Sequence, residues 1–179
     1  MKYMRNLYGV MVFCFACSVV KGQDQDEAPR TSTFAQASIR FKDTYVKITY
    51  SQPDKAGREI FGELIPYGKV WRTGANEATE ITTTKHISLN GFLLKAGTYS
   101  IFTIPGPDTW TIIINSELGL WGAYNHNPRL DILKFQVPST KSTDIHERFT
   151  IQFAQRNESA DLALMWDDVK VVVPIKFLN

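Results

Sequence analysis

The sequence has very few cysteines, and both lie in one apolar stretch near the N-terminus. Cys14 and Cys17 fall within residues 7–20, and no other thiol occurs in the 179-residue chain. If that stretch is removed on export, the mature chain has neither thiols nor disulfides. This excludes thiol catalysis and thiolate metal sites from the mature protein. Its stability then depends on an apolar core.

Long hydrophobic runs are also absent, because the apolar stretch is too short to span a membrane comfortably. Lys2 and Arg5 precede it, and the polar residues 23–27 follow it. A charged start, a short apolar run and a polar exit are typical of a secretory signal peptide. We therefore predict an exported protein, periplasmic or extracellular, with no membrane span in its mature form.

The residues at the end of this run predict where it is cleaved. Val20 and Gly22 are small enough for the minus-three and minus-one positions, which places cleavage before Gln23 and defines residues 1–22 as the signal peptide. An uncleaved N-terminal anchor is one alternative. Lipid attachment at Cys17 is another, although the residues before it fit a lipoprotein cleavage box poorly.

The chain contains no cluster of basic residues. Its 20 Lys and Arg and 18 Asp and Glu give a formal net charge of +2. Loss of Lys2, Arg5 and Lys21 with the signal peptide, without loss of any acid, leaves 17 basic against 18 acidic residues and a net charge of −1. Proteins that bind nucleic acids normally carry a clustered basic face, so we exclude a nucleic-acid partner.

Histidines and nucleophile motifs are scarce as well. His86, His126 and His146 stand alone, without the two-histidine helical spacing of a hydrolytic zinc site. No Gly-x-Ser-x-Gly motif occurs, so the sequence shows no serine nucleophile on a strand-to-helix turn. We expect no metal, no cofactor and no catalytic residue.

Helical periodicity long enough for a crossover between parallel strands is missing, and the chain instead alternates as β-strands do. Val46, Ile48 and Tyr50 share one parity of a half-buried strand. Asn90-Gly91 lies between two apolar segments and is a strong hairpin signal, because both residues tolerate positive φ. Further strands are expected at residues 67–70, 80–84, 98–104, 110–115, 132–137, 149–153, 162–166 and 169–177.

These patterns predict an all-β fold, an antiparallel β-sandwich or flattened barrel of roughly nine or ten strands. Residues 23–36 are polar and aperiodic and are predicted to form a flexible leader, followed by a single domain at residues 37–179. Pro174 lies on the outward parity of the last strand, which suggests a sheet edge. The core is expected to include Trp110, Phe153, Leu164 and Val171.

Polar groups of several kinds are concentrated among small residues at positions 71–79. We expect this stretch to form a bend between strands, because bends on rigid scaffolds often carry binding groups. The loop at residues 119–129 is a second candidate, since long loops with aromatic residues are often functional. The predicted ligand-binding residues are Arg72, Asn76, Glu77, Thr79, Trp121 and Tyr124.

Three segments of the chain resemble one bacterial family. They are residues 57–62, residues 68–79 with the run Trp-Arg-Thr-Gly-Ala-Asn-Glu, and residues 96–102. From about Ala37 to the C-terminus, the chain is similar to the family called domain of unknown function 2911. The resemblance implies an exported protein and implies no particular activity.

Three classes of function remain open. In a non-catalytic binding domain, Arg72 offers a planar fork to a carboxylate, a phosphate or a sugar hydroxyl, and the other candidates add hydrogen bonds and an aromatic wall. In an envelope hydrolase acting on a glycan or peptide, Glu77 works with a second carboxylate, which is Glu80, Asp131 or Asp168. In a purely structural domain, Arg72 pairs with Glu77. We favour the first class, with a small molecule, a glycan or an envelope protein as the partner.

Overall fold

The computed structural model describes residues 32–178, so the predicted signal peptide at residues 1–22 lies outside the described residues. Strands account for most of the described chain. In order they are β1 (Thr33–Phe41), β2 (Thr44–Gln52), β3 (Ala75–Thr83), β4 (Ile87–Leu89), β5 (Phe92–Leu94), β6 (Gly97–Ile104), β7 (Thr109–Asn115), β8 (Asp131–Arg156) and β9 (Ser159–Phe177), with a single 3₁₀ turn, η1 (Pro128–Leu130), before β8. No helix within residues 32–178 is long and apolar enough to cross a membrane.

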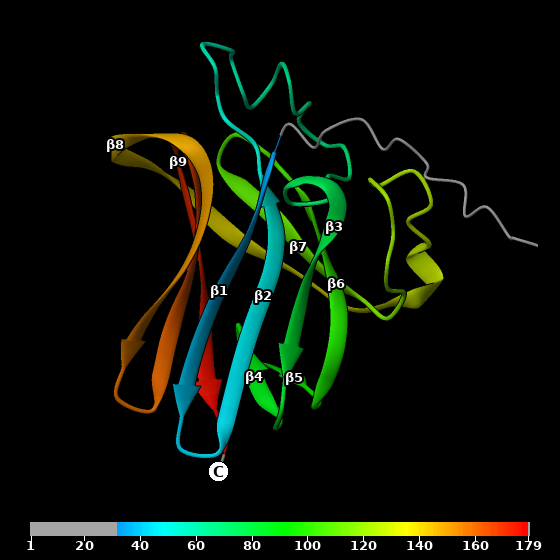
Figure 1. Cartoon of the computed structure of the whole chain (residues 1–179), viewed down its shortest axis with the longest axis vertical. Coiled ribbons are helices and arrows are strands. Elements are labelled where there is room, and N and C mark those ends of the chain that lie inside the picture. Colours follow the sequence, from blue (N-terminus) through cyan, green and yellow to red (C-terminus); the bar gives the residue numbers. More distant parts are fainter. Residues whose placement is uncertain (1–31, 179) are drawn as a thin grey trace, which may run out of the picture.

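All strand pairs are antiparallel, and hydrogen bonding runs through nine strands in the order β1-β2-β3-β6-β7-β8-β9-β4-β5. The sheet does not close into a barrel. It instead folds over so that β8, β9, β4 and β5 face the other strands in two layers (Figure 1). The predicted all-β, antiparallel sandwich of nine or ten strands is confirmed.

The two longest strands correct the predicted strand boundaries. Separate strands were expected at residues 132–137 and 149–153, but β8 is continuous through both and shifts its register twice between Lys141 and Thr150. Such irregularities bend a strand, which lets β8 pair with β7 at one end and with β9 at the other. The polar residues in between broke the apolar alternation because they belong to the exposed part of a single strand.

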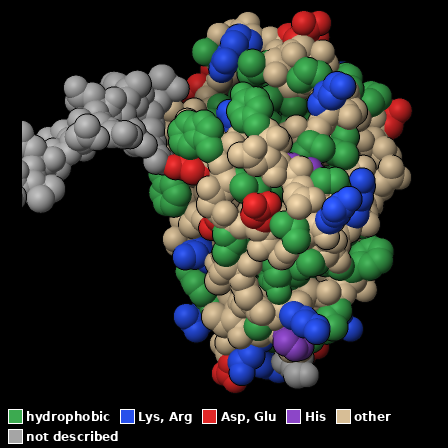
Figure 2. Space-filling view, turned by 90° about the vertical axis from the view of Figure 1, so that its right-hand side faces the viewer, with side chains coloured by type: hydrophobic (Ala, Val, Ile, Leu, Met, Phe, Trp, Pro, Cys, Tyr) green, Lys and Arg blue, Asp and Glu red, His purple; other side chains and the backbone are tan. Residues whose placement is uncertain are grey.

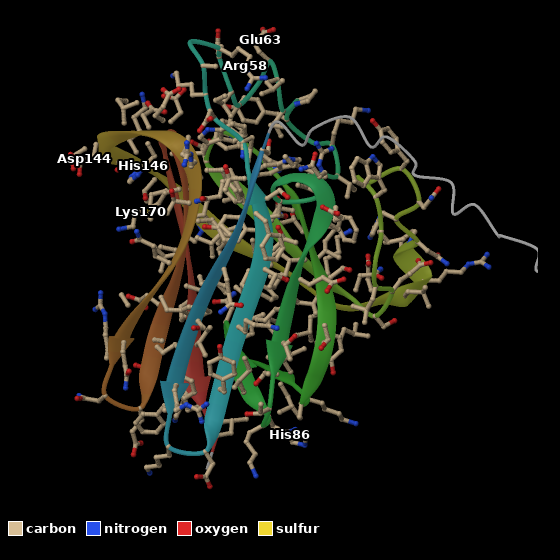
Figure 3. All side chains as sticks on the ribbon, viewed as in Figure 1. Arg58, Glu63, His86, Asp144, His146 and Lys170 are labelled. Carbon is tan, nitrogen blue, oxygen red and sulfur yellow. The ribbon has the colours of Figure 1, made fainter. Side chains whose placement is uncertain are left out.

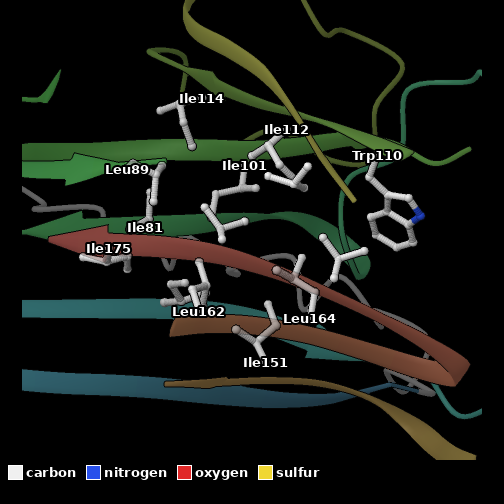
Figure 4. Close-up of a cluster of buried hydrophobic side chains, with 14 of the residues drawn as sticks. Ile81, Leu89, Ile101, Trp110, Ile112, Ile114, Ile151, Leu162, Leu164 and Ile175 are labelled. Carbon is white, nitrogen blue, oxygen red and sulfur yellow. The ribbon is translucent and has the colours of Figure 1, made fainter. Parts of the chain in front are cut away.

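The apolar core lies between the two layers (Figure 4). Val46, Ile48 and Tyr50 of β2 all point into it and are buried, as their shared parity predicts. Three of the four expected core residues are buried, while the fourth is only partly buried against the edge of the core. The buried ones are Trp110, Leu164 and Val171, and the partly buried one is Phe153.

The hairpin prediction is confirmed, because Asn90 and Gly91 have φ values of 50° and 86° and connect Leu89 to its partner Phe92. The domain boundary differs, since β1 begins at Thr33, inside the segment predicted as leader.

The predicted edge at Pro174 is wrong, because β9 lies between β8 and β4. Proline is tolerated there because the β4 ladder ends at this point. Only the Pro174 carbonyl is used, and it accepts the Asn90 amide at 2.7 Å.

Candidate functional site

Residues 71–79, here called the Arg72 loop, consist of a short turn and the first residues of β3, and hydrogen bonds hold the two parts together. Trp71 bridges to Thr103 of β6, with amide-to-carbonyl distances of 2.7 and 2.9 Å in the two directions. Thr79 closes the loop, because its amide donates to the Arg72 carbonyl at 3.1 Å and its hydroxyl donates to the Thr73 carbonyl at 2.6 Å. The base from which the Arg72 side chain projects is therefore fixed by four hydrogen bonds.

Two residues of this loop have unfavourable backbone conformations. Thr73 has a φ of 58° and Asn76 has a φ of 57°, and positive φ is especially rare for a β-branched residue such as threonine. Thr73 is completely buried, and its hydroxyl donates to the Thr103 hydroxyl at 3.1 Å. Strain of this kind persists only where the surroundings enforce it, and it is concentrated at functional sites.

A large bulge in β3 displays the second half of the loop. In the register with β2, Thr49 pairs with Glu80 and Ser51 pairs with Ala75, so residues 76–79 all lie opposite the single residue Tyr50. A bulge bends its strand and redirects the side chains that it carries. Part of the stretch predicted as a bend is thus an irregular strand, and the turn itself is confined to Arg72, Thr73 and Gly74.

An aromatic cluster supports the loop from below. The Trp71 indole stacks on Trp166 with ring centroids 5.9 Å apart and meets Phe61, Trp110 and Phe149 edge to face. Its N–H donates to the Gly74 carbonyl at 3.0 Å, so the cluster also fixes the turn. Dense packing of buried aromatic side chains makes the base of the Arg72 loop rigid.

A polar hollow of about 540 Å³ lies on one side of the Arg72 loop. Asp54, Arg58, Arg72, Asn76 and Trp166 are among its lining residues. Arg58, one of these lining residues, lies at the upper end of the molecule in Figure 3.

An apolar hollow of about 280 Å³ adjoins the same loop. Leu64, Ile65, Val70 and Tyr124 line it together with Arg72. Because Arg72, Leu64 and Ile65 line both hollows, they form the wall between them. The guanidinium is thus placed where a polar and an apolar compartment meet.

Arg72 and Asn76 carry the two buried side-chain atoms of the described chain that have no hydrogen-bond partner. These are Arg72 Nε and Asn76 Nδ2, and both are donors. Burial lowers the pKa of Arg72 from its usual value, and the nearby Tyr124 opposes this by raising it. Buried polar groups are normally satisfied, so two unpaired donors in one loop make it a candidate site for an acceptor from outside the chain.

The long loop at residues 116–130 pairs with the β3 bulge as a short extra strand. The Ala78 amide donates to the Leu120 carbonyl at 2.8 Å, and the Gly122 amide donates to the Asn76 carbonyl at 2.9 Å. Glycine suits this position because φ is 71°, which other residues rarely adopt, and a Cβ here would also displace the Tyr124 ring, 2.8 Å away. The pairing therefore places Tyr124 beside the Arg72 loop.

A buried polar network holds the other end of this loop. His126 Nε2 lies 2.8 Å from Asp131 Oδ1, and the same oxygen accepts the Asn115 amide at 2.8 Å. The His126 ring also packs on Phe102, with centroids 4.8 Å apart. His126 thus anchors the loop.

Of the six predicted site residues, three line a hollow and three do not. Arg72 lies between the hollows, Asn76 lines the polar one, and Tyr124, which is 86% exposed, lines the apolar one. Glu77 lies across from Trp121 in an isolated bridge, and neither lines either hollow. The last of the six, Thr79, is completely buried and uses its hydroxyl inside the loop.

Several lining residues were not predicted from the sequence. Leu64, Ile65, Lys69 and Val70 come from the segment before the Arg72 loop. A strand had been expected at residues 67–70, but this part of the chain forms only isolated bridges, at Ile65 and at Trp71. Apolar residues without β-alternation, between Gly62 and Gly68, are the one signal in this segment. Asp54, Arg58 and Trp166 of the polar hollow gave no local signal at all.

The carboxylates proposed as hydrolase partners of Glu77 make contacts of their own. Glu80 Oε1 accepts the Gly119 amide at 3.0 Å, Asp131 holds His126, and Asp168 lies 3.4 Å from Lys141. Each of these contacts is made outside the two hollows.

The histidines are spread over the fold. His86 and His146 lie at opposite ends of the molecule (Figure 3), while His126 is in the long loop. Across residues 32–178, no three His, Cys, Asp or Glu side chains come together as metal ligands would.

Comparison with known proteins gives one assignment. Neither the curated proteins nor the solved structures include a match to this chain. The model of the family described as protein of unknown function (DUF2911) matches residues 32–175, which spans the Arg72 loop, both hollows and eight strands in full. The chain belongs to this family of proteins of unknown function, DUF2911.

Proposed function

We propose that this protein is an exported, non-catalytic binding domain that holds a small anionic ligand at Arg72. The observation that carries the proposal is the pair of buried, unpartnered donors, Arg72 Nε and Asn76 Nδ2, in a strained loop between two hollows. Both atoms need an acceptor, and the guanidinium favours a negatively charged one.

Rigidity of the site supports binding. The Arg72 loop is fixed from below by the aromatic cluster and from within by the hydrogen bonds of Thr79. Affinity is greatest when little has to be ordered on binding, so a loop held in place before the ligand arrives suits a receptor. The same arrangement lowers the stability of the free protein, because strained backbone and unpaired buried donors both destabilise the folded state.

The face that carries β6 and the long loop offers less support for a purely structural or docking role. On the side of the molecule that carries β6 and the long loop, apolar side chains form separate small groups among polar ones (Figure 2). Large docking interfaces normally show one contiguous apolar patch.

Titration of defined anions tests the binding proposal. Acetate, inorganic phosphate and glucuronate, with neutral N-acetylglucosamine as the uncharged comparison, are titrated into the protein and followed by NMR or calorimetry. We expect at least one anion to bind the wild type and to lose its binding in Arg72→Met. Arg129→Met makes the same side-chain change at an exposed position and should leave binding unchanged. Absence of any anion binding, or binding that survives Arg72→Met, would overturn the proposal.

Export is part of the proposal and has its own test. The motivation is the charged start, the apolar run at residues 7–20 and the polar exit. Intact-mass analysis of the protein recovered from the cell envelope or medium should show a chain that begins at about Gln23. A chain that retains Met1, or one acylated at Cys17, would contradict cleavage at that position.

A further inference from the structure

The apolar hollow differs from the rest of the surface in the charges that border it. Lys69 and Arg72 both line it, and it has no acidic side chain among its described lining residues. The remaining walls are apolar or aromatic, from Leu64, Val70 and Tyr124 among others. An apolar compartment with two cations at its border is complementary to a molecule with an anionic head and an apolar body.

The charged side chains of another large hollow provide a comparison. Its volume is about 610 Å³, and its lining includes Asp167, Asp168 and Lys141. Asp167 pairs with Lys55, and Asp168 pairs with Lys141 at 3.4 Å. These two carboxylates are paired within the chain, and Glu59 and Asp108 also line this hollow, so its lining is mainly acidic, whereas that of the apolar hollow has basic side chains only.

Resting on the proposed function, we infer that the ligand is an apolar carboxylate, whose charged group binds Arg72 and whose hydrocarbon part fills the apolar hollow. A carboxylate matches the planar fork of a guanidinium, with two parallel N–H···O bonds. Asn76, on the far side of Arg72, supplies a further donor to any acceptor that extends into the polar hollow. Lys69 is exposed and adds attraction at the rim.

The size of the apolar hollow limits the hydrocarbon part. About 280 Å³ lies at the lower end of the range of ligand pockets, which points to one side chain or a short acyl group rather than a long lipid tail. Each methylene that becomes buried should tighten binding about fourfold, until the hollow is full.

A matched series of acids measures this directly. The dissociation constants should fall about fourfold from N-acetylglycine to N-acetylalanine, and by up to about 250-fold from N-acetylglycine to N-acetylleucine if all four added carbons are buried. N-acetylleucinamide has the same body without the charge and should bind at least tenfold more weakly than N-acetylleucine. If neither chain length nor charge changes the affinity of these acids while acetate or phosphate still binds at Arg72, the inference is overturned and the proposed function stands. If no anion binds at all, the inference and the proposed function are both overturned.

Two sources of the same chemistry are separated by 4-methylpentanoate, which is N-acetylleucine without its acetamido group. Tighter binding of N-acetylleucine would identify the C-terminus of a peptide, with the amide as an additional acceptor for Asn76. Equal binding would identify a short fatty acid.

A substitution that fills the apolar hollow tests where the hydrocarbon part of the ligand binds. Ala123→Leu adds bulk to the wall of the apolar hollow, and Ala154→Leu makes the same change at an exposed position of β8. We expect Ala123→Leu to remove the difference between N-acetylglycine and N-acetylleucine while acetate still binds, and Ala154→Leu to preserve the wild-type series. A series unchanged in Ala123→Leu would show that the hydrocarbon part lies elsewhere.

Discussion

Replacing Arg72 with methionine distinguishes a guanidinium that serves the fold from one that serves a ligand. Methionine keeps an unbranched apolar stem and removes the charge and all five N–H donors. In the free protein Arg72 Nε is buried without a partner, and leaving such a donor unsatisfied costs about 1–3 kcal/mol. Because the side chain is only partly buried and the stem is retained, we expect the free energy of unfolding to rise by about 1 kcal/mol, at the lower end of that range.

Urea denaturation followed by tryptophan fluorescence measures this change. Trp71 and Trp166 lie directly beneath the loop, so their emission reports on the part of the core that the substitution touches. The dependence of the unfolding free energy on urea should keep its slope, since the surface exposed on unfolding hardly changes. Arg129→Met is the matched control at an exposed site and should shift stability by no more than about 0.5 kcal/mol.

The opposite result would refute the reasoning. If Arg72 formed a buried ion pair that holds the loop together, its removal would leave a carboxylate uncompensated and lower stability by about 3–5 kcal/mol. A loss of that size in Arg72→Met, with no change in the control, would show that the guanidinium is part of the fold. The proposed ligand site would then have lost its central residue.

Three further substitutions test the scaffold around the site. Thr79→Val keeps the shape of the side chain but leaves the buried Thr73 carbonyl unpaired, and thermal unfolding should show a loss of about 1–3 kcal/mol. Burial raises the pKa of Tyr50 above its usual 10.0, so the stability that this shift contributes is complete below pH 10 and is lost as the pH rises through the higher folded-state pKa. In Tyr50→Phe, denaturation curves should no longer show this alkaline loss of stability. The same substitution removes the 2.9 Å hydrogen bond that the Ile151 amide donates to the Tyr50 hydroxyl. Gly74→Ala places a Cβ 3.0 Å from a β2 carbonyl and 3.2 Å from the Thr79 hydroxyl, and it should lower the melting temperature and broaden the NMR signals of the loop.

Much of the fold was predictable because strand burial follows local alternation. The parity of Val46, Ile48 and Tyr50 identified the inner face of β2, and Asn90-Gly91 identified the β4–β5 hairpin from two residues. Strand order was beyond the sequence, since it depends on which distant strands pair. The unity of β8 was missed for a related reason, because its polar middle section is exposed and carries no alternation.

The candidate site was predictable in its chemistry and unpredictable in its shape. Arg72, Asn76 and Tyr124 were identified because charged, amide and aromatic groups are conspicuous in a bend or long loop. Thr79 also has a polar side chain, but its hydroxyl donates a hydrogen bond within the loop. No local sequence pattern distinguishes a polar side chain that faces a hollow from one that stabilises the loop. The apolar hollow is built from a loop without periodicity, so only the folded chain shows that Val70 faces Arg72.

The β3 bulge explains why strain, unpaired donors and a cavity occur together. Four residues face one in the register with β2, so the chain has more length there than the sheet can pair. The second half of this surplus packs inward, because Ala78 is buried in a cluster with Phe102 and Ile113 and Thr79 is completely buried. The first half, Asn76 and Glu77, is only partly buried. The long loop pairs with the bulge there, and Asn76 has a positive-φ conformation. A regular strand would pair its backbone groups along β2 and alternate its side chains between two faces, so the irregular register is the feature that brings Arg72 and Asn76 together at the candidate site.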